Sequence, residues 1–269
     1  MEILEGIGDW RERYARWKLT NEMRGADVGA HYPWVVNRHA PFVPARRALP
    51  MLNLALITSA GAYIDGTEPF DTSIAGGDVS HREIPVEVEA TDLKWSVRGY
   101  DASAVEKDMN SQAPVERLQE FEGNGIIGQL NPVWWSLCGF IPSAGRFVET
   151  ALPQLVERVV RYEVQAALLV PASHLCHQTM GLVARALEAA RIPTMTLAVD
   201  REAMERVRAP RAVYYAGEFG SVAGLPNFPE HQRRILDEAL RLIEPMDQIS
   251  VHKLTVELQS EVEKSRGER

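Results

Sequence analysis

Four side chains that can take part in chemistry lie within one short stretch of the chain. Ser173, His174, Cys176 and His177 bring an alcohol, a thiol and two imidazoles together. Of these groups, only a thiolate can both attack an electrophile at neutral pH and leave again. We therefore predict that Cys176 is a nucleophile and that His177 takes part in catalysis with it. Ser173 and His174 would bind the substrate.

Three other interpretations of this stretch stay open. Cys176 could be a buried packing residue, with the histidines capping a helix. The side chains of His174, Cys176 and His177 are all metal-ligand types, but this spacing matches no common zinc pattern, so we predict no metal site. A serine nucleophile would need a histidine oriented by an acidic group, and the loop itself contains no Asp or Glu.

The sequence around this stretch predicts where it lies in a fold. Residues 166–170 form a short apolar run, typical of a strand buried on both faces. Residues 178–190 follow helical spacing, and residues 192–197 form the next apolar strand. The first loop of such a βαβ unit lies at the carboxyl end of a strand, where open parallel sheets bind ligands. Because the start of a helix lowers the pKa of a thiol, we expect a low pKa for Cys176.

Apolar runs and amphipathic stretches alternate along most of the chain. This pattern predicts an α/β fold of three layers with a largely parallel sheet, built from flavodoxin-like or racemase-like halves and preceded by an extended N-terminal arm. We expect strands near residues 52–58, 126–130, 166–170, 193–198 and 211–215.

The chain is expected to fall into three parts. Residues 1–50 would form a helix and an extended arm punctuated by prolines, which fix the backbone and remove hydrogen-bond donors. Residues 51–246 would form the α/β catalytic domain. Residues 247–269 would form a C-terminal tail that frays.

Composition sets further bounds on this chain of 269 residues. Its 45% hydrophobic and 25% charged residues are typical of soluble globular proteins. A net charge of −8 argues against sequence-independent binding of nucleic acid. No apolar run is long enough to span a membrane, and the charged N-terminus does not resemble a signal peptide. Cys138 and Cys176 are too few for a disulfide framework, so we expect a cytoplasmic protein with reduced thiols.

Small and polar residues in other loops are further candidates for substrate binding. Ser59 and Gly61 follow the strand expected at residues 52–58, and small residues there let backbone N–H groups approach a ligand. Asp78 and Asn110 belong to two other polar stretches. We expect all four residues to contact the substrate.

Arg82 and Glu83 precede a predicted edge strand over residues 84–88. This neighbouring pair could be a solvated ion pair, or a carboxylate clamp beside a general base. We expect the loops 59–66, 78–83 and 171–177 to converge on one pocket. Arg82 would then hold a substrate carboxylate, and Glu83 would be a catalytic residue that handles a proton.

Several separate stretches carry a resemblance to a known family. They are LALITSAG (54–61), GDVSHREIP (77–85), GYDASAVEKDMN (99–110), PVERLQEFEGNGIIG (114–128), the Cys176 loop with GLVARALEAARIPT (181–194), and APRAVYY with its glycine-rich sequel (209–224). In this order, over roughly residues 50–245, they resemble the selenoprotein B family of glycine, sarcosine, betaine and D-proline reductases.

The resemblance implies reductive cleavage of a C–N bond at a selenocysteine that lies three residues before a cysteine and a histidine. It also implies a partner subunit that supplies a pyruvoyl group. Here the position matching the selenocysteine is Ser173, while Cys176 and His177 are kept. A serine hydroxyl is barely ionised at neutral pH and cannot replace a selenolate. The chain is thus identified as a selenium-free relative, in which Cys176 would act alone.

We therefore expect a thiol-dependent enzyme that acts reductively on a small amino-acid-like or sulfur-containing substrate. One alternative is a lyase or hydrolase that uses Cys176 to cleave a C–S or C–N bond without net redox change. Another is a non-catalytic assembly subunit of a reductase complex. No intrinsic cofactor is expected, and an external thiol or protein reductant would resolve an adduct on Cys176. The expected partners are the small substrate, a partner subunit and further copies of the chain.

Overall fold

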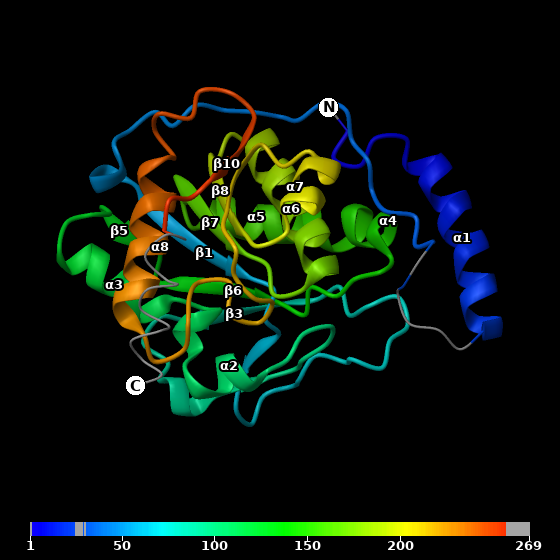
Figure 1. The fold of residues 1–269 in the computed structure, drawn as a ribbon, viewed down its shortest axis with the longest axis horizontal. Coiled ribbons are helices and arrows are strands. Elements are labelled where there is room, and N and C mark those ends of the chain that lie inside the picture. The colour runs from blue at the N-terminus through cyan, green and yellow to red at the C-terminus, as the bar shows by residue number, and fades with distance from the viewer. Residues whose placement is uncertain (1, 25–28, 30, 257–269) are drawn as a thin grey trace.

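A computed structural model describes residues 2–24, 29 and 31–256 (Figure 1). Its centre is an eight-stranded sheet in the order β10-β9-β8-β7-β1-β6-β3, with β5 pairing beside β1. Every strand pair is parallel except β3 with β6, which is antiparallel. The bounds are β1 Asn53–Thr58, β3 His81–Pro85, β5 Gln129–Leu130, β6 Val133–Leu137, β7 Ala166–Val170, β8 Thr194–Ala198, β9 Arg211–Tyr214 and β10 Ser250–Lys253.

Helices and a small second sheet surround this central sheet (Figure 1). The second sheet pairs β2 (Ala62–Ile64) with β4 (Leu93–Trp95) in antiparallel fashion. The α-helices are α1 Ile7–Arg24, α2 Ser103–Lys107, α3 Val115–Gly123, α4 Ala144–Arg146, α5 Leu152–Arg161, α6 His174–Ala189, α7 Arg201–Val207 and α8 Pro229–Arg241. Short turns of 3₁₀-helix lie at Leu49–Met51, Ala90–Asp92 and Met109–Ser111.

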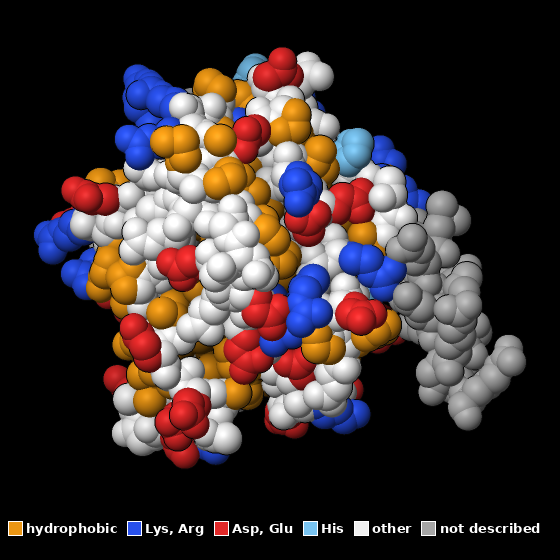
Figure 2. Space-filling model, turned by 90° about the vertical axis from the view of Figure 1, so that its left-hand side faces the viewer, with side chains coloured by type: hydrophobic (Ala, Val, Ile, Leu, Met, Phe, Trp, Pro, Cys, Tyr) orange, Lys and Arg blue, Asp and Glu red, His pale blue; other side chains and the backbone are white. Residues whose placement is uncertain are grey.

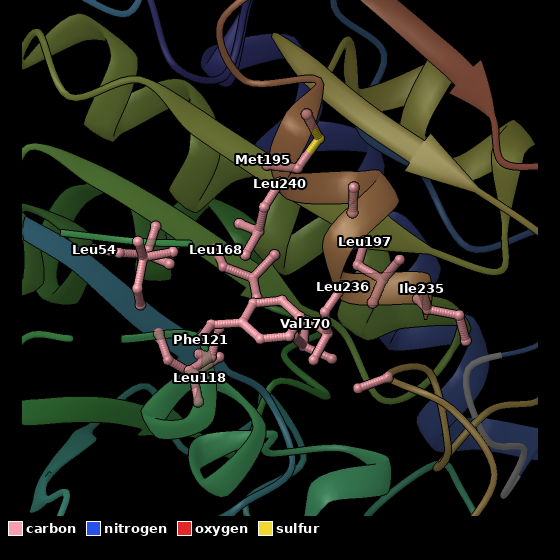
Figure 3. Close-up of a cluster of buried hydrophobic side chains, with 14 of the residues drawn as sticks. Leu54, Leu118, Phe121, Leu168, Val170, Met195, Leu197, Ile235, Leu236 and Leu240 are labelled. Carbon is pink, nitrogen blue, oxygen red and sulfur yellow. The ribbon is translucent and has the colours of Figure 1, made fainter. Parts of the chain in front are cut away.

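The central strands β1, β7 and β8 are buried on both faces, and their alternate side chains belong to two separate cores. In β1, Leu54 and Leu56 pack with α3 and α8, whereas Ala55 and Ile57 pack with the side of α5 and α6. Figure 3 shows the first of these cores, where Leu168 of β7 lies among leucines and Phe121. Burying each such side chain stabilises the fold by about 1.5–3 kcal/mol. A sheet that is apolar on both faces requires helices on both faces, which gives three layers.

The structure confirms a mixed α/β fold with a mostly parallel sheet, and all five expected strands are present. The flavodoxin-like or racemase-like halves stay a prediction. Three strands were not expected. β2 lies within residues 59–66, which were predicted to be a loop, β6 falls in an apolar stretch for which no element was predicted, and β10 lies within the expected tail 247–269, where it pairs in parallel with β9. No helix in the described part of the chain is both long and apolar enough to cross a membrane.

The helical stretch over residues 144–161 is continuous but not regular. A π-helical turn over Phe147–Ala151 precedes α5. Pro153 in the first turn of α5 has no N–H to donate four residues back, which accounts for the irregular turn before it. The apolar residues Leu155 and Val159 are buried, and Arg161 in the last turn is exposed.

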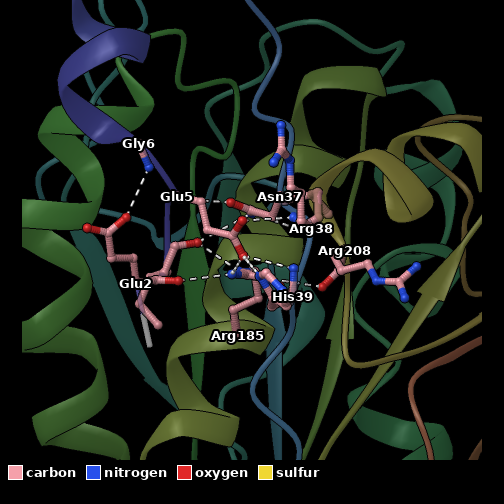
Figure 4. Close-up of polar contacts among 10 residues, drawn as sticks. Glu2, Glu5, Gly6, Asn37, Arg38, His39, Arg185 and Arg208 are labelled. Carbon is pink, nitrogen blue, oxygen red and sulfur yellow. Dashed lines mark hydrogen bonds and ion pairs between the residues drawn. The ribbon is translucent and has the colours of Figure 1, made fainter.

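Residues 31–48 run over the molecule without helix or strand, and two buried arginines hold the segment. Arg185 of α6, which is fully buried, donates to the backbone oxygens of Ile3, His39, Arg208 and Glu2 (Figure 4). These bonds tie the N-terminal residues and the segment to α6. Each carbonyl satisfies one donor of a guanidinium that would otherwise be costly to bury.

A second anchor is an ion pair without solvent contact. Arg211 Nη1 donates to Glu188 Oε1 over 2.5 Å, and both side chains are fully buried. Glu188 also accepts from the N–H of Val43, and Arg211 donates to the carbonyl of Val43. The buried pair therefore fixes Val43 of the extended segment against α6 and β9.

Candidate functional site

The sheet has a point where the direction of winding reverses. After β1 the chain forms β6 on one side of β1, then crosses to form β7 on the other side, and continues through β8, β9 and β10 away from it. In open parallel sheets, ligands bind at the carboxyl ends of the two strands that flank such a point. Here those ends carry Ser59 after β1 and residues 171–173 after β7.

Ser59 ties the two loops together. Its N–H donates to the carbonyl of Val170 over 3.1 Å, and its hydroxyl accepts from the N–H of Ala172 over 2.9 Å. The side chain and backbone of Ser59 are both buried, so water does not compete for these bonds. The structure thus brings the predicted residue Ser59 to the Cys176 loop.

Ser173 begins helix α6 as its N-cap. Its backbone is extended (φ −137°, ψ 175°), and its hydroxyl accepts from the N–H of Cys176 over 3.2 Å. The same hydroxyl lies 3.0 Å from the sulfur of Cys176 and donates to it. The predicted pair Ser173 and Cys176 is therefore in direct contact at the start of a long helix.

The thiol of Cys176 is completely enclosed. It has no solvent exposure, and its sulfur lies 4.0 Å from the carbonyl oxygen of Ser59. Gly139, which follows β6, closes the other side: a Cβ there would come within 3.2 Å of the sulfur and 2.3 Å of the Cβ of Ser59. The hydroxyl of Thr179 donates to the carbonyl of Gly139 over 2.7 Å and holds this wall in place.

Burial changes the expected chemistry of the thiol. A low pKa is expected for Cys176 from its position at the start of a helix. In the structure, removal from water raises the pKa of Cys176, and the hydrogen bonds from Ser173 and its neighbours only oppose this rise. The expectation of a low pKa is wrong for this closed arrangement, because desolvation outweighs the helix start.

His177 is fully buried and both of its ring nitrogens are in use. Nδ1 lies 2.6 Å from the carbonyl oxygen of Ser173, so it carries the proton and donates. Nε2 lies 3.1 Å from the backbone N–H of Val199 and accepts from it. Burial lowers the pKa of His177 to about 4, so the ring is neutral at physiological pH. The ring bridges the Cys176 loop to the end of β8, and a catalytic role for it stays a prediction.

We expect this buried histidine to make the fold sensitive to acid. In the unfolded chain its pKa is near 6.5, whereas burial holds it near 4, so between these values the unfolded state binds more protons. The free energy of unfolding should therefore fall as pH drops through this window, by about 3 kcal/mol in total. Urea unfolding at pH 7 and at pH 4.5 measures this loss. The variant His177→Gln should show a clearly smaller loss, and an equal loss in both proteins would contradict the assignment.

An outer group of aromatic side chains lies over the same loop. The imidazole of His174 is half-exposed, contacts the carboxylate of Asp200, and packs edge-on against Trp34 with ring centres 4.5 Å apart. Phe219, which is 43% exposed, packs against the ring of His177 with centres 5.7 Å apart. Sequence reasoning missed Gly139, Asp200, Trp34 and Phe219 as neighbours of the Cys176 loop.

Arg82 and Glu83 are not brought together. They are consecutive residues of β3, so their side chains point to opposite faces of the sheet. Arg82 donates to the carbonyl oxygens of Glu68 and Pro69 and stacks on Phe70. These contacts place the guanidinium against the loop that precedes the strand.

The carboxylate of Glu83 has partners of its own. Arg158 donates to both of its oxygens, over 2.6 and 2.7 Å, and the indole N–H of Trp135 donates over 3.3 Å. The hydrogen bonds from Arg158 hold the pKa of Glu83 below its usual value, so it is ionised at neutral pH. The proton-handling role of Glu83 stays a prediction that these contacts do not support.

The remaining predicted residues have structural partners. Gly61 adopts a positive φ of 74°, and a Cβ there would lie 2.2 Å from the carbonyl oxygen of Ser96 in the neighbouring chain segment. Asp78 accepts from the N–H and the hydroxyl of Ser80, which shapes the loop before β3. Asn110 bonds to Asp108 and lines a separate cavity of about 610 Å³ beside β4 and α2. Their contacts with substrate stay predictions.

Among the residues that the structure describes, no three His, Cys, Asp or Glu side chains gather into a group that could hold a metal ion. Fold and site together define an α/β protein with a capped, buried thiol at the switch point of a parallel sheet.

Comparison with known proteins identifies the family. The chain is 30% identical over 200 residues to the D-proline reductase subunit gamma of Acetoanaerobium sticklandii, which covers 74% of this chain and 81% of that protein. It is 27% identical over 188 residues to a sarcosine reductase complex component B subunit beta of Peptoclostridium acidaminophilum, and 24% identical over 185 residues to a glycine reductase complex component B subunit gamma of Symbiobacterium thermophilum.

The chain belongs to the family of amino-acid reductase subunits that contains these proteins. The matches cover 67% and 66% of this chain but only 42% of the sarcosine and glycine reductase subunits, so those two relatives are much longer than the shared region. No protein-family model matches the chain. No solved structure matches it either.

Proposed function

We propose that this chain is a subunit of an amino-acid reductase complex and that Cys176 is its nucleophile. The observation that carries the proposal is the contact between the Ser173 hydroxyl and the Cys176 sulfur, 3.0 Å apart, at the switch point of the sheet. A ligand at that point would meet a thiol, a hydroxyl and the start of a helix of 16 residues. The relatives are named as subunits of D-proline, sarcosine and glycine reductases, which supports a small amino-acid-like substrate and a partner subunit for this chain.

The proposed chemistry needs two electrons from outside the chain. The Cys176 thiolate attacks the substrate carbon, the C–N bond breaks, and the amine leaves with a proton. An external dithiol then attacks the sulfur of the resulting thioether, the carbon takes a proton, and a mixed disulfide with Cys176 remains. The second thiol of the reductant releases Cys176 and ends as a disulfide. Ser173 donates a hydrogen bond to the sulfur and favours its anionic form.

This chemistry requires the closed site to open. The N–H of Gly220 donates to the carbonyl of Ala172 over 2.9 Å, which fastens residues 217–224 onto the Cys176 loop. Phe219 of the same segment covers His177. We propose that binding of substrate or of a partner subunit displaces this segment, which lets water reach the thiol and lowers its pKa.

Alkylation tests whether the segment gates the thiol. Iodoacetamide should label Cys176 slowly in the wild-type protein, because the sulfur is buried and largely protonated. Phe219→Ala should raise the labelling rate about tenfold or more, measured by mass spectrometry of the peptide. Cys138, which is buried and whose pKa burial raises to about 12, serves as the internal control.

The matched control is Val160→Ala, which trims an exposed apolar side chain on α5, away from the Cys176 loop. It should leave both labelling rates unchanged. Equal labelling of Cys176 in Phe219→Ala and wild type, or a parallel rise for Cys138, would contradict gating by this segment.

A second candidate function is a non-catalytic assembly subunit. Three observations favour this function. Cys176 is fully buried, burial raises its pKa, and both ring nitrogens of His177 already have hydrogen-bond partners. The test is turnover by the co-purified complex with D-proline, sarcosine or glycine and a dithiol. Turnover that survives replacement of Cys176 assigns this chain to assembly. Product formation without any reductant would instead indicate a C–N or C–S lyase or hydrolase.

A further inference from the structure

Three arginines of this acidic protein lack a carboxylate partner and lie around one hollow. Acidic and basic side chains are neighbours over the middle of the face that carries α3 and α8 (Figure 2), and Arg241 forms an ion pair with Asp237 on α8. Within the described residues, Arg46, Arg47 and Arg191 have no ion pair. All three line a single cavity of about 200 Å³.

The cavity lies at the amino-terminal ends of the parallel strands, whereas Cys176 lies at their carboxyl ends. Its other walls come from Leu52 before β1, from Val164 and Gln165 before β7, and from Pro193 before β8. These are the amino-terminal ends of the parallel strands, whereas the Cys176 loop follows the carboxyl end of β7. A ligand in this cavity therefore belongs to a different site from the one described above.

The two segments that carry the arginines are held in place. Val43, shortly before Arg46, is fixed by the buried Glu188–Arg211 pair through both its N–H and its carbonyl. Arg191 follows α6 with a positive φ of 68°, and the N–H groups of Arg191 and Ile192 donate back into the helix. Glycine is the usual residue at such a turn, and an arginine there is costly. Arg46, Arg47 and Arg191 are exposed side chains, and the cavity that they line has no carboxylate to neutralise them.

Gln165 supplies a further donor. Its side-chain oxygen accepts from the N–H of Asn53 over 3.1 Å, which leaves the NH₂ group as its free donor. None of the cavity's lining residues, all of which belong to the described part of the chain, is acidic. Like charges that line one cavity are stabilised by an anion that accepts hydrogen bonds from several of them at once.

We infer that this cavity binds a small oxyanion with at least two negative charges, such as inorganic phosphate, pyrophosphate or a dicarboxylate. Guanidinium groups bind phosphate and carboxylate oxygens through paired N–H donors, which suits either source. The cavity is smaller than the roughly 300–1,000 Å³ of pockets for drug-sized ligands, so a nucleotide would not be enclosed. The bound anion would join the extended segment to the end of α6.

Titration calorimetry of the full chain at constant ionic strength tests this inference. Pyrophosphate, phosphate and malonate are titrated separately, with chloride as the monovalent reference. At least one of the three should bind with a dissociation constant below about 1 mM and raise the melting temperature by roughly 3–5 °C at ten times that concentration. Tighter binding of pyrophosphate assigns the site to phosphate compounds, and tighter binding of malonate assigns it to polycarboxylates.

Charge-removing variants show whether the anion binds in this cavity. Arg46→Gln and Arg191→Gln should each weaken binding about tenfold or more. The matched control is Arg13→Gln, which removes the same charge from an exposed position of α1 and should change affinity less than twofold. Circular dichroism checks that each variant is folded. The inference is overturned if none of the anions binds better than chloride, or if Arg13→Gln weakens binding as much as the cavity variants do.

Discussion

Replacing Cys176 with serine is expected to abolish turnover of the reconstituted reductase complex, by a factor on the order of 10⁴ or more. A serine hydroxyl fits the same enclosed space, so the fold should be kept. It is neither ionised at neutral pH nor able to form the mixed disulfide that the proposed reaction needs. Ser173→Ala should cost only about ten- to a hundredfold, since it removes one or two hydrogen bonds to the sulfur and the helix start.

Both variants are measured with the same substrate panel and dithiol, beside the wild-type complex. Cys138→Ser serves as the matched control, because Cys138 is also buried and follows a neighbouring strand, and it should keep most of the activity. If Cys176→Ser turns over at nearly the normal rate while Ser173→Ala is inactive, the two roles are reversed and the thiol is structural.

Removing one partner of the Glu188–Arg211 pair is expected to destabilise the protein by about 3–5 kcal/mol. Both side chains are fully buried, so Arg211→Met leaves a carboxylate without its cation in a medium of low dielectric constant. Burial already raises the pKa of Glu188, and Arg211 is the main group that opposes this rise. The variant also loses the bond to the carbonyl of Val43 that anchors the extended segment.

Urea unfolding at neutral pH measures this loss. Arg241→Met is the matched control, because it breaks an exposed ion pair with Asp237 on α8 and should change the free energy of unfolding by no more than about 1 kcal/mol. A loss below about 1 kcal/mol for Arg211→Met would mean that water reaches the pair in solution, which would contradict the full burial of both side chains.

The sequence was sufficient for the strands that make the centre of the sheet. Residues 53–58, 166–170 and 194–198 are short apolar runs between breaks, which is the pattern expected of strands buried on both faces. It was not sufficient for β6, where paired tryptophans and Ser136 obscure the alternation, nor for β10, whose residues are partly exposed at an edge. Strands of this kind are decided by what pairs beside them, which a single sequence does not reveal.

The candidate site, too, was predicted from the sequence only in part. The rule that ligands bind at the carboxyl ends of parallel strands predicts that Ser59, Ser173 and Cys176 lie near one another, and they do. Applied to the expected strand at 193–198, it would also have found Asp200. It could not find Gly139, because that residue follows the unexpected strand β6. Trp34 reaches the site from the extended segment, and nothing in its sequence context indicates that contact.

Charged residues in the sequence predicted the candidate site less well than the positions of the strand ends did. Arg82 and Glu83 are adjacent in the chain, yet strand geometry separates them to opposite faces. The pKa of Cys176 depends on burial, which no local motif reveals and which exceeds the effect of the helix start. Local residue types identified the loop that holds the thiol, and the folded structure alone determined its protonation.

The position of β1 at the centre of the sheet has a consequence for the synthesis of the protein. β1 is complete at residue 58, but its neighbours on the two sides are residues 129–137 and 166–170. While the ribosome adds the residues in between, this apolar strand has no native partner on either edge. Distant parallel pairing of this kind folds slowly and leaves unpaired strands exposed to aggregation. Production of this chain should therefore benefit from slow translation and from chaperones that hold apolar segments until β7 has left the ribosome.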